Sequence, residues 1–572
     1  MKPIAFAAAR FRSLAEPLLE RAREEPARTA LVLLHDDENE EIVSHGRLHA
    51  GAMAWATLFR DSGILRGEMV IIALRHSLAL VQAVWGAFYR GILPSVYASP
   101  GPMALNERYA QRLADLARGA GARAVVAMPE LVPSLRRWLE DTGCRVIPTG
   151  PSQGSIAERD KASVIAPGQE EEIAYVQFTS GSTGRRKGVQ LSHRAILDWM
   201  EALTRSLPLY DSDSQVSWLP LHHDFGLIFG MMMPVFMGFP TILISPFKWL
   251  RKPVVQLQAI HKHRATLSLL PNSALNHLVR GVAERDLESL DLKTLELLFN
   301  GSEPVYFRSQ QLFLERFAPC GFRDSALATG YGMAESTLGV SISPRGERSR
   351  VDWVDGPAMT RSRRALALRP GEAGAVPLVS SGRPLAGMEV VIVDERRGRL
   401  PERRIGEIAV RGPGLFSGYR GRPDLSRQVL RDGWYSSGDL GYMASGELYV
   451  TGRKKDLIIV GGQNVHPEDA EQAAIDLLGI DPGRAVSFGI PDELTGTDRI
   501  VLVCELRGAI GDAERLAAEQ RLRRRVFEDL DVVLGDVRFS DRGWIVRTAN
   551  GKLARGRCRE KYLDEVSGGG KG

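Results

Sequence analysis

The sequence contains little cysteine. Only four residues in 572 are cysteine: Cys144, Cys320, Cys504 and Cys558. They stand far apart in the chain, so they form none of the short spacings that bind zinc or carry out redox chemistry. Scattered single thiols are typical of a reducing compartment, and we therefore expect a cytoplasmic protein.

A strong excess of one charge is also missing. The chain has 74 Lys and Arg against 69 Asp and Glu, a net charge of +5, and the two signs are interspersed. This mild positive charge is compatible with a protein that binds anionic substrates and with one that binds nucleic acid, so it does not distinguish between the two. The rest of the composition, 44% hydrophobic and 25% charged, is that of a globular protein, and the length predicts roughly three to four domains.

One uncharged stretch, residues 225–247, is long enough for a membrane span. Four residues would split such a helix: Pro234, Gly238, Pro240 and Pro246. We expect a buried helix over 225–237, a turn, and a buried strand over 241–245, and hence no membrane span. The first 25 residues predict an amphipathic helix rather than a signal peptide, because charged residues soon interrupt their short apolar patch.

Short apolar runs alternate with helical patterns through the first 300 residues. Several runs are continuously apolar, which suits strands buried on both faces. This order predicts a layered α/β architecture. The runs are residues 30–34, 69–74, 122–128, 174–179, 241–245, 265–270 and 295–301.

The texture changes twice further along the chain. From about residue 380, short β-prone runs separated by turn residues predict a smaller β-rich region, and after 452–456 a new set of strands and an Arg-rich helix near 514–528 begins. We therefore predict an α/β fold. Its parts are a large N-terminal domain of layered subdomains plus a β-rich subdomain (1–453), a small α+β C-terminal domain (456–566), and a disordered tail (567–572).

Residues 345–377 are polar, rich in arginine and only weakly periodic. Two interpretations stay open for this segment: an insertion that lies on the surface, or a plain solvated loop.

The stretch TSGSTGRRKG, residues 179–188, follows a predicted strand. It is not a Walker A loop, because Gly188 rather than a hydroxyl residue follows Lys187. Its glycines nevertheless permit close approach of the backbone to a ligand, and successive N–H groups can form an anion nest. The cations that close the loop favour a phosphate site over a linker. The residues concerned are Thr179, Ser180, Gly181, Ser182, Thr183, Gly184 and Lys187.

Four further motifs are weak when taken singly. NGSEP (300–304) is a turn after a strand, YGMAEST (331–337) contains one glutamate, YSSGDLGYM (435–443) places an aspartate in a glycine turn, and TANGKLARG (548–556) places a lysine in a loop. A lone glutamate or lysine is usually a solvated surface charge, and a Gly-Asp pair is usually only a turn.

Together and in this order, the motifs resemble the adenylate-forming superfamily, which includes acyl-CoA synthetases, luciferases and adenylation domains. The resemblance covers about residues 25–565. Within the superfamily the chain most resembles fatty acyl-AMP ligases, because WLPLHHDFGLIFG, FNGSEPV, FAPCGFRDSALATGYGMAEST and LVSSGRPLAGMEVVIVD all look like that family. The segment near 345–377 falls where those ligases carry an insertion.

The resemblance implies the cofactors ATP and Mg²⁺, and a mobile C-terminal domain that turns about Lys455. It implies that the 179–187 loop holds the β- and γ-phosphates, that Glu335 and Thr179 are at the metal, and that Asp439, near Arg453, binds the ribose. Lys552 would reach the carboxylate and the α-phosphate. The adenine would be lined by Ser302, Glu303, Pro304, Tyr331, Gly332 and Met333. The acyl substrate would be bound by His223, Asp224, Phe225, Met231 and Ser302, between residues 218–233 and 265–275.

The function that this resemblance implies is activation of a medium- or long-chain fatty acid to an acyl-adenylate, followed by transfer to the phosphopantetheine thiol of an acyl carrier protein. We expect no nucleic-acid partner. Arg186 replaces the usual proline, and GGQNVHPED (461–469) looks closer to the CoA-ligase version, so a fatty acyl-CoA ligase is the alternative. Asp224 leaves open an amino-acid substrate, whose ammonium it would bind. The third hypothesis is a non-catalytic homologue that binds nucleotide or acyl groups. The presence together of Glu335, Asp439 and Lys552 argues against it.

Overall fold

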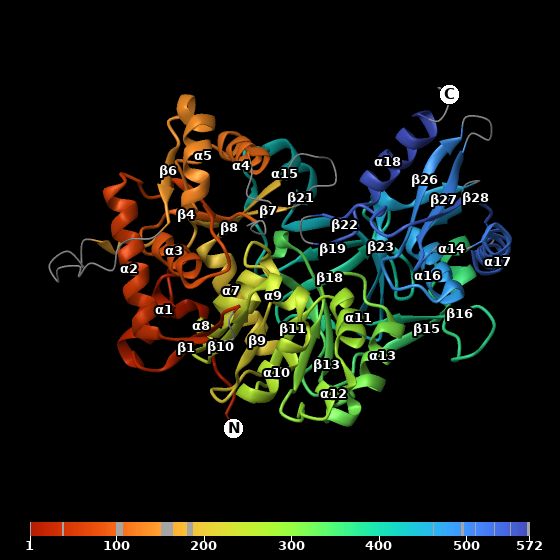
Figure 1. Ribbon diagram of the computed structural model, residues 1–572, viewed down its shortest axis with the longest axis horizontal. Helices are drawn as coiled ribbons and strands as arrows, with labels where there is room; N and C mark the ends of the chain where they lie inside the picture. Colours follow the sequence, from red (N-terminus) through yellow and green to blue (C-terminus); the bar gives the residue numbers. More distant parts are fainter. Residues whose placement is uncertain are drawn as a thin grey trace.

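The computed structural model describes residues 2–36, 39–98, 107–149, 164–179, 187–460, 463–492, 497–508, 511–530, 532–548 and 551–568. In Figure 1 the chain runs from red N-terminal helices on the left, through a yellow and green central sheet, to a blue C-terminal part at the upper right. The predicted α/β class is confirmed by this arrangement of several sheets flanked by helices.

A nine-stranded sheet forms the centre of the molecule, in the order β17-β14-β13-β12-β11-β9-β10-β1-β2. The strands from β13 to β1 run parallel, whereas β14 and β2 pair antiparallel with their neighbours. Every residue of β10 and β11 is buried, as expected for a continuously apolar strand covered on both faces. The strands are β1 (Thr29–Leu34), β2 (Glu40–Ser44), β9 (Gln215–Ser217), β10 (Thr241–Ile244), β11 (Leu267–Leu270), β12 (Leu297–Asn300), β13 (Leu327–Gly332), β14 (Gly339–Ile342) and β17 (Arg383–Pro384).

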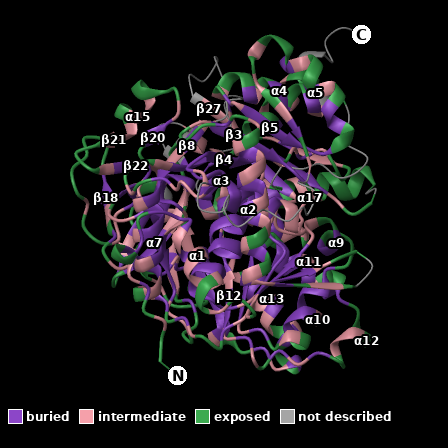
Figure 2. Ribbon diagram, turned by 90° about the vertical axis from the view of Figure 1, so that its left-hand side faces the viewer, coloured by how far each residue is buried: buried purple, intermediate pink, exposed green. Residues whose placement is uncertain are grey.

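A second, four-stranded sheet is parallel throughout, in the order β4-β3-β5-β6. Strands β3, β4 and β5 are buried throughout (Figure 2), whereas the edge strand β6 is partly exposed. Serines start the nearby helices: Ser44 and Ser77 each accept a hydrogen bond from the main-chain N–H three residues further on. The strands are β3 (Met69–Ala73), β4 (Leu93–Val96), β5 (Ala124–Ala127) and β6 (Arg145–Pro148).

The helices of the N-terminal part pack around these two sheets (Figure 1). The expected N-terminal amphipathic helix is found as α1, and it packs against α2 and α8 (Met233–Met237). The helices are α1 (Glu16–Glu24), α2 (His45–Asp61), α3 (Leu78–Tyr89), α4 (Glu107–Ala120), α5 (Val132–Leu139), α7 (His193–Ser206), α9 (Pro246–Arg251), α10 (Val254–His263), α11 (Asn272–Gly281), α12 (Glu284–Leu287) and α13 (Phe307–Phe317).

Two antiparallel sheets complete the N-terminal part. The three-stranded sheet β20-β8-β7 carries the approach to the Gly/Ser/Thr-rich loop, and the five-stranded sheet of β18, β19, β21, β22 and β23 is the expected β-rich region. Their elements are β7 (Ile173–Thr179), β8 (Lys187–Ser192), β18 (Glu389–Val393), β19 (Gly406–Arg411), β20 (Gly418–Tyr419), α15 (Pro423–Val429), β21 (Leu430–Arg431), β22 (Trp434–Ala444) and β23 (Glu447–Arg453).

The C-terminal part is a small α+β unit around the sheet β26-β27-β28. Alternate residues of β26 and β27 enter two separate apolar clusters, so the sheet is covered on both faces. The Arg-rich helix expected near 514–528 is α17. The elements are β24 (Ile458–Val460), β25 (Gln463–Val465), α16 (Pro467–Leu478), β26 (Ala485–Asp492), β27 (Thr497–Glu505), α17 (Asp512–Leu530), β28 (Leu534–Ser540) and α18 (Arg555–Gly568).

The Arg-rich segment after residue 345 is folded. Its strands β15 (Val351–Asp355) and β16 (Ala375–Val379) form an antiparallel pair, joined through α14 (Gly356–Ser362). Val354 and Ala365 are fully buried against the five-stranded sheet. The solvated-loop interpretation is therefore wrong, because this segment has an apolar face of its own to bury. That it is an insertion stays a prediction.

The uncharged stretch 225–247 folds inside the N-terminal part, as expected. It forms a π-helix, η5 (Phe225–Met232), continued by α8 (Met233–Met237), and Gly238 ends it with φ +84°. Pro234 has no N–H to donate to the turn before it. The carbonyls of Phe229 and Gly230 instead accept hydrogen bonds from Gln215 Nε2, at 3.1 and 3.0 Å. Among the described residues, no helix is long and apolar enough to cross a membrane.

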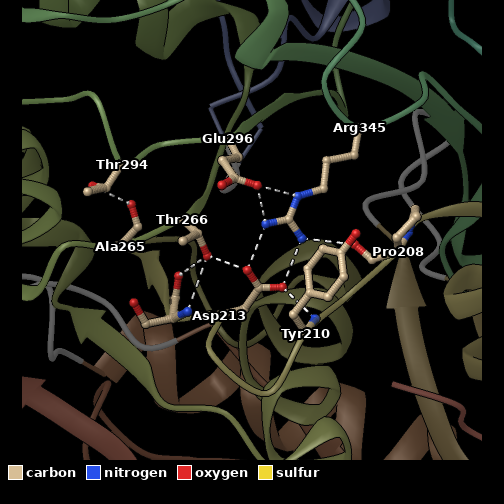
Figure 3. A network of polar contacts seen from close by, with 9 residues as sticks. Pro208, Tyr210, Asp213, Ala265, Thr266, Thr294, Glu296 and Arg345 are labelled. Carbon is tan, nitrogen blue, oxygen red and sulfur yellow. Dashed lines mark hydrogen bonds and ion pairs between the residues drawn. The ribbon is translucent and has the colours of Figure 1, made fainter. Parts of the chain in front are cut away.

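An ion-pair network built around a buried arginine–aspartate pair lies at the amino ends of the central strands (Figure 3). Arg345 donates to both oxygens of Asp213, at 2.7 and 2.8 Å, and to Glu296 at 2.8 Å. Thr266 also donates to Asp213, at 2.6 Å. The residues Asp213, Thr266 and Glu296 precede β9, β11 and β12, respectively. The network therefore fixes these strands at their amino ends. The loops at the opposite, carboxyl ends remain available to form a ligand site.

Candidate active site

A cavity of about 830 Å³ opens at the carboxyl ends of the parallel strands. The loops after β9, β12 and β13 supply His223 and Asp224, Ser302, and Glu335 respectively. Ligands of α/β sheets bind outside the carboxyl ends of strands, and ligand sites of this kind have volumes of about 300–1,000 Å³. This cavity is therefore the candidate active site.

The cavity brings together most of the described side chains that the sequence singled out. Twelve of them line it: Lys187, His223, Asp224, Phe225, Ser302, Tyr331, Gly332, Met333, Glu335, Asp439, Arg453 and Lys552. Their convergence from segments more than 300 residues apart is what the motif order predicted. Their individual roles stay predictions.

The other predicted site residues are placed differently. Met231 is fully buried and Pro304 is exposed, and neither lines the cavity. Glu303 accepts hydrogen bonds from the N–H and hydroxyl of Ser273, at 2.9 and 3.2 Å, at the start of α11. Its carboxylate thus caps a helix. The side chains of Thr179 and Lys455, and residues Ser180, Gly181, Ser182, Thr183 and Gly184, lie outside what the structure describes.

Asp439 lies between a hydroxyl and a guanidinium. It accepts a hydrogen bond from the Tyr331 hydroxyl at 2.7 Å, and its other oxygen is 3.1 Å from Arg453 Nε. The pairing of β22 with β23 places Asp439 directly opposite Arg453. Asp439 raises the pKa of Arg453, and burial together with Asp439 raises the pKa of Tyr331. The carboxylate is therefore held rigidly at the wall of the cavity.

Glu335 is held from two sides. Its Oε1 accepts a hydrogen bond from the Tyr419 hydroxyl at 2.7 Å, and its main-chain carbonyl accepts one from the N–H of Phe416 at 2.9 Å. The Lys187 ammonium lies 4.9 Å from the centre of the Tyr419 ring, a cation–π contact. One oxygen of the carboxylate is thus fixed, and a cation stands nearby.

Lys552 comes from the C-terminal part and reaches the wall of the cavity where His223 and Asp224 lie. Burial lowers the pKa of Lys552, while the charge of Asp224 opposes that shift. His223 Nδ1 and Asp224 Oδ1 are 2.6 Å apart. Burial alone would raise the pKa of Asp224, but His223 and Lys552 lower it, so the carboxylate stays ionised. An ammonium and a carboxylate thus face each other across the two parts of the chain.

An aromatic wall extends the cavity away from these charges. The rings of Phe225, Phe229 and Phe299 lie 5.4–6.2 Å apart in pairs. Aliphatic and indole side chains continue this apolar lining: Trp199, Leu203, Leu338, Ile342 and Leu385. The expected second wall, residues 265–275, is not part of the lining. A cavity with charges at one end and apolar side chains at the other suits an amphiphilic substrate.

The backbone is strained beside the charged groups. Ser302 has φ +72° and Thr337 has φ +64°, in the left-handed region that residues other than glycine rarely adopt. Thr337 is held there by its hydroxyl, which donates to the Gly414 carbonyl at 2.8 Å. Gly332 permits this turn, because a Cβ at that position would lie 1.8 Å from the Leu338 carbonyl oxygen. The turn brings Glu335 back towards the sheet.

The donor set fits ATP and Mg²⁺. Lys187, Arg453 and Lys552 supply the positive charge that a triphosphate needs, and Asp439 can accept from ribose hydroxyls. In the described part of the chain, no group of three or more histidine, cysteine or acidic side chains could hold a metal ion alone. Mg²⁺ is typically held by one or two carboxylates together with phosphates and water. Glu335 would be such a carboxylate.

The sequence did not reveal several residues of the site. Tyr419 and Trp199 occur in runs that read as ordinary core or strand, with no local signal for a site. Phe229 and Phe299 stand in the strings WLPLHHDFGLIFG and FNGSEPV, but neither was singled out as a site residue. Gln177 also lines the cavity, and its amide donates to the His222 carbonyl at 2.9 Å. The end of β7 was the only signal for Gln177, since it precedes the predicted phosphate loop.

The fold is that of the adenylate-forming enzymes, which combine a large N-terminal domain with a small C-terminal one. The family model "AMP-binding enzyme" matches residues 18–420, and the chain belongs to this family of ATP-dependent enzymes.

Known proteins of this family resemble the whole chain. A protein of Caulobacter vibrioides named "Putative acyl-CoA synthetase" is 30% identical over 526 residues, 91% of each chain. The medium-chain-fatty-acid–[acyl-carrier-protein] ligase JamA of Moorena producens is 30% identical over 586 residues, 97% of this chain and 95% of its own. A solved structure from a study of fatty acyl-adenylate ligases of E. coli and L. pneumophila is 27% identical, with a TM-score of 0.87 over 99% of this chain and all of that chain.

Proposed function

We propose that this protein is a fatty acyl-AMP ligase. It activates a medium- or long-chain fatty acid with ATP and passes the acyl group to the phosphopantetheine thiol of an acyl carrier protein, in the cytoplasm. The observation that carries the proposal is a single cavity where Lys552, Glu335 and Asp439 converge beside an apolar wall. The similarity to JamA and to the fatty acyl-adenylate ligases supports it.

The first step joins two anions, so the residues must first overcome repulsion. An oxygen of the fatty-acid carboxylate attacks the α-phosphorus of ATP, the bond to the β-phosphate breaks, and pyrophosphate leaves with its electron pair. The Lys552 ammonium stabilises the negative charge that builds up on the α-phosphate. The apolar wall of Phe225, Phe229 and Phe299 holds the acyl chain, and so aligns the carboxylate for attack.

The remaining site residues hold the nucleotide. Asp439 accepts from the ribose hydroxyls, and the turn around Ser302 and Tyr331 lines the adenine. Glu335 holds Mg²⁺, which neutralises phosphate charge when it is bound. Lys187, at the exit of the Gly/Ser/Thr-rich loop, pairs with a phosphate oxygen.

The second step requires a different orientation of the C-terminal part. In the present one, Lys552 occupies the cavity and Arg280 of α11 lies 2.5 Å from Asp481 of the C-terminal part. This is the arrangement that adenylation needs. Rotation about Lys455 then withdraws Lys552 and admits the thiol, which attacks the acyl carbon and releases AMP.

The two competing substrates, an amino acid and a fatty acid, differ in whether they need Asp224 as a binding partner. An amino acid would need this carboxylate for its ammonium group, yet Asp224 is already paired with His223 and accepts a hydrogen bond from the N–H of Phe225 at 2.7 Å. A fatty acid has no ammonium group and therefore needs no contact with Asp224. A fatty acyl-CoA ligase shares the first step and stays the second candidate, supported by GGQNVHPED and by the resemblance to the Caulobacter protein.

Pyrophosphate release with a panel of acids tests the proposal. With ATP and Mg²⁺, fatty acids of medium and long chain should stimulate release at least tenfold over acetate or phenylalanine, because only a long chain covers the aromatic wall. If phenylalanine stimulated release as well as the fatty acids do, the substrate class would be wrong.

A further inference from the structure

Tyr419 contacts two charged groups of the site at once. Its hydroxyl donates to Glu335 Oε1 at 2.7 Å, and its ring lies under the Lys187 ammonium at 4.9 Å. The side chain is only 3% exposed. Tyr435 lines the same cavity and is a side-chain hydrogen-bond partner of the Tyr419 hydroxyl.

The main chain around Tyr419 is anchored on the same two neighbours. Strand β20 pairs antiparallel with β8, with Tyr419 opposite Val189, and the N–H of Arg420 donates to the Gly188 carbonyl at 2.8 Å. On the other side, the N–H of Phe416 donates to the Glu335 carbonyl. Residues 416–420 therefore join the exit of the Gly/Ser/Thr-rich loop to the loop that carries Glu335.

The hydrogen bond decides how Glu335 can bind a cation. A carboxylate that rotates freely must lose that freedom when it binds a metal, and a nearby lysine competes for its charge. The Tyr419 hydroxyl holds one oxygen in a fixed direction. The Tyr419 ring offers the Lys187 ammonium a cation–π contact as an alternative to an ion pair with Glu335. The lysine can therefore bind a phosphate instead of the carboxylate.

We propose that Tyr419 is a positioning residue for the divalent cation: it fixes Glu335 so that the second carboxylate oxygen binds the metal, and it keeps Lys187 apart as a phosphate ligand. The proposal rests on the proposed function for its nucleotide and metal, but does not depend on which acid is activated. Partners that orient a metal ligand typically contribute 10–100-fold to metal affinity.

The test is Mn²⁺ binding to the full chain with a non-hydrolysable ATP analogue, followed by electron paramagnetic resonance. Tyr419→Phe keeps the ring and removes the hydroxyl, and should weaken Mn²⁺ binding by about tenfold or more. Tyr442→Phe is the matched control. It removes an equally buried hydroxyl that donates to a carboxylate at the same distance, Asp352 at 2.7 Å, and should bind Mn²⁺ as the wild type does.

Wild-type Mn²⁺ affinity in Tyr419→Phe would overturn the proposal. So would an equal loss in Tyr442→Phe, or a wild type that binds no more Mn²⁺ than the nucleotide does alone. In a Glu335→Gln background, Tyr419→Phe should cause no further loss, because the two residues act as one unit. If Tyr419→Phe does not fold, Tyr435→Phe provides a milder version and should weaken binding in the same direction; no change there would count against the proposal.

Turnover provides a second readout. Excess Mg²⁺ should restore the rate of Tyr419→Phe towards the wild-type maximum, which loss of structure would not allow. If no fatty acid stimulates pyrophosphate release but the Mn²⁺ pattern holds, then the proposed function fails and the role of Tyr419 stands.

Discussion

Replacing Lys552 by alanine is expected to reduce acyl-adenylate formation roughly a hundredfold while ATP still binds. The ammonium is needed chiefly in the transition state, where charge builds up on the α-phosphate, and such a contact contributes about 3 kcal/mol in a site that excludes water. ATP binding should persist because Asp439 and Lys187 belong to the N-terminal part. The measurement is the rate of acyl-adenylate formation alongside the Kd for ATP.

The loop itself should survive the Lys552→Ala change. The main chain around Lys552 is held by a hydrogen bond from the N–H of Thr548 to the Lys552 carbonyl, at 2.8 Å, which alanine retains. Lys561→Ala is the control: this lysine lies on α18, stacks on Trp544, and does not line the cavity. Near-wild-type adenylation by Lys552→Ala, or an equal loss in Lys561→Ala, would remove Lys552 from the chemistry.

Loss of the metal, or of the charge that holds it, should have the second-largest effect. Chelation with EDTA should abolish pyrophosphate release by the wild type. Glu335→Gln should raise the Mg²⁺ concentration for half-maximal rate by at least tenfold, because a neutral amide is a poorer ligand than a carboxylate. Glutamine can still accept the hydrogen bond from Tyr419, so the loop should keep its shape.

Glu447→Gln separates this effect from general destabilisation. Glu447 is only 3% exposed and pairs with Arg383 at 2.9 Å, away from the cavity. Its replacement should lower Tm and leave the Mg²⁺ requirement unchanged. Pyrophosphate release that continued unchanged in EDTA would show that the metal has no part in the reaction.

The sequence predicted the buried parallel strands of both large sheets well, and the reason is physical. A run such as MVIIA over 69–73 can be continuously apolar only if both of its faces are buried, and β3 is buried throughout. The stretch 225–247 was predicted as helix, turn and strand because prolines and a glycine divide it. The π-helical turns were not predicted, because they depend on Gln215, which lies outside this stretch. Its side-chain amide donates hydrogen bonds to main-chain carbonyls of the π-helix, in place of main-chain N–H groups.

The site was predicted by motif order rather than by local chemistry. Taken alone, Glu335 and Lys552 have the pattern of surface charges, and only their resemblance to a family brought them together. Tyr419 could not be predicted in this way, because it acts on a carboxylate 84 residues earlier in the chain. The folded segment after Arg345 was missed for a related reason: its burial depends on residues of β22 and β23 such as Tyr442 and Tyr449.

The fate of the acyl group tests the central claim most directly. The protein is supplied with dodecanoate, ATP and Mg²⁺, and then with either CoA or a holo acyl carrier protein, and the acyl products are quantified by mass spectrometry. The account predicts that acyl-AMP accumulates in the presence of CoA and is consumed by the carrier protein, which becomes acylated, more slowly as salt rises. Formation of acyl-CoA at the rate of adenylation would contradict it and identify the protein as a fatty acyl-CoA ligase.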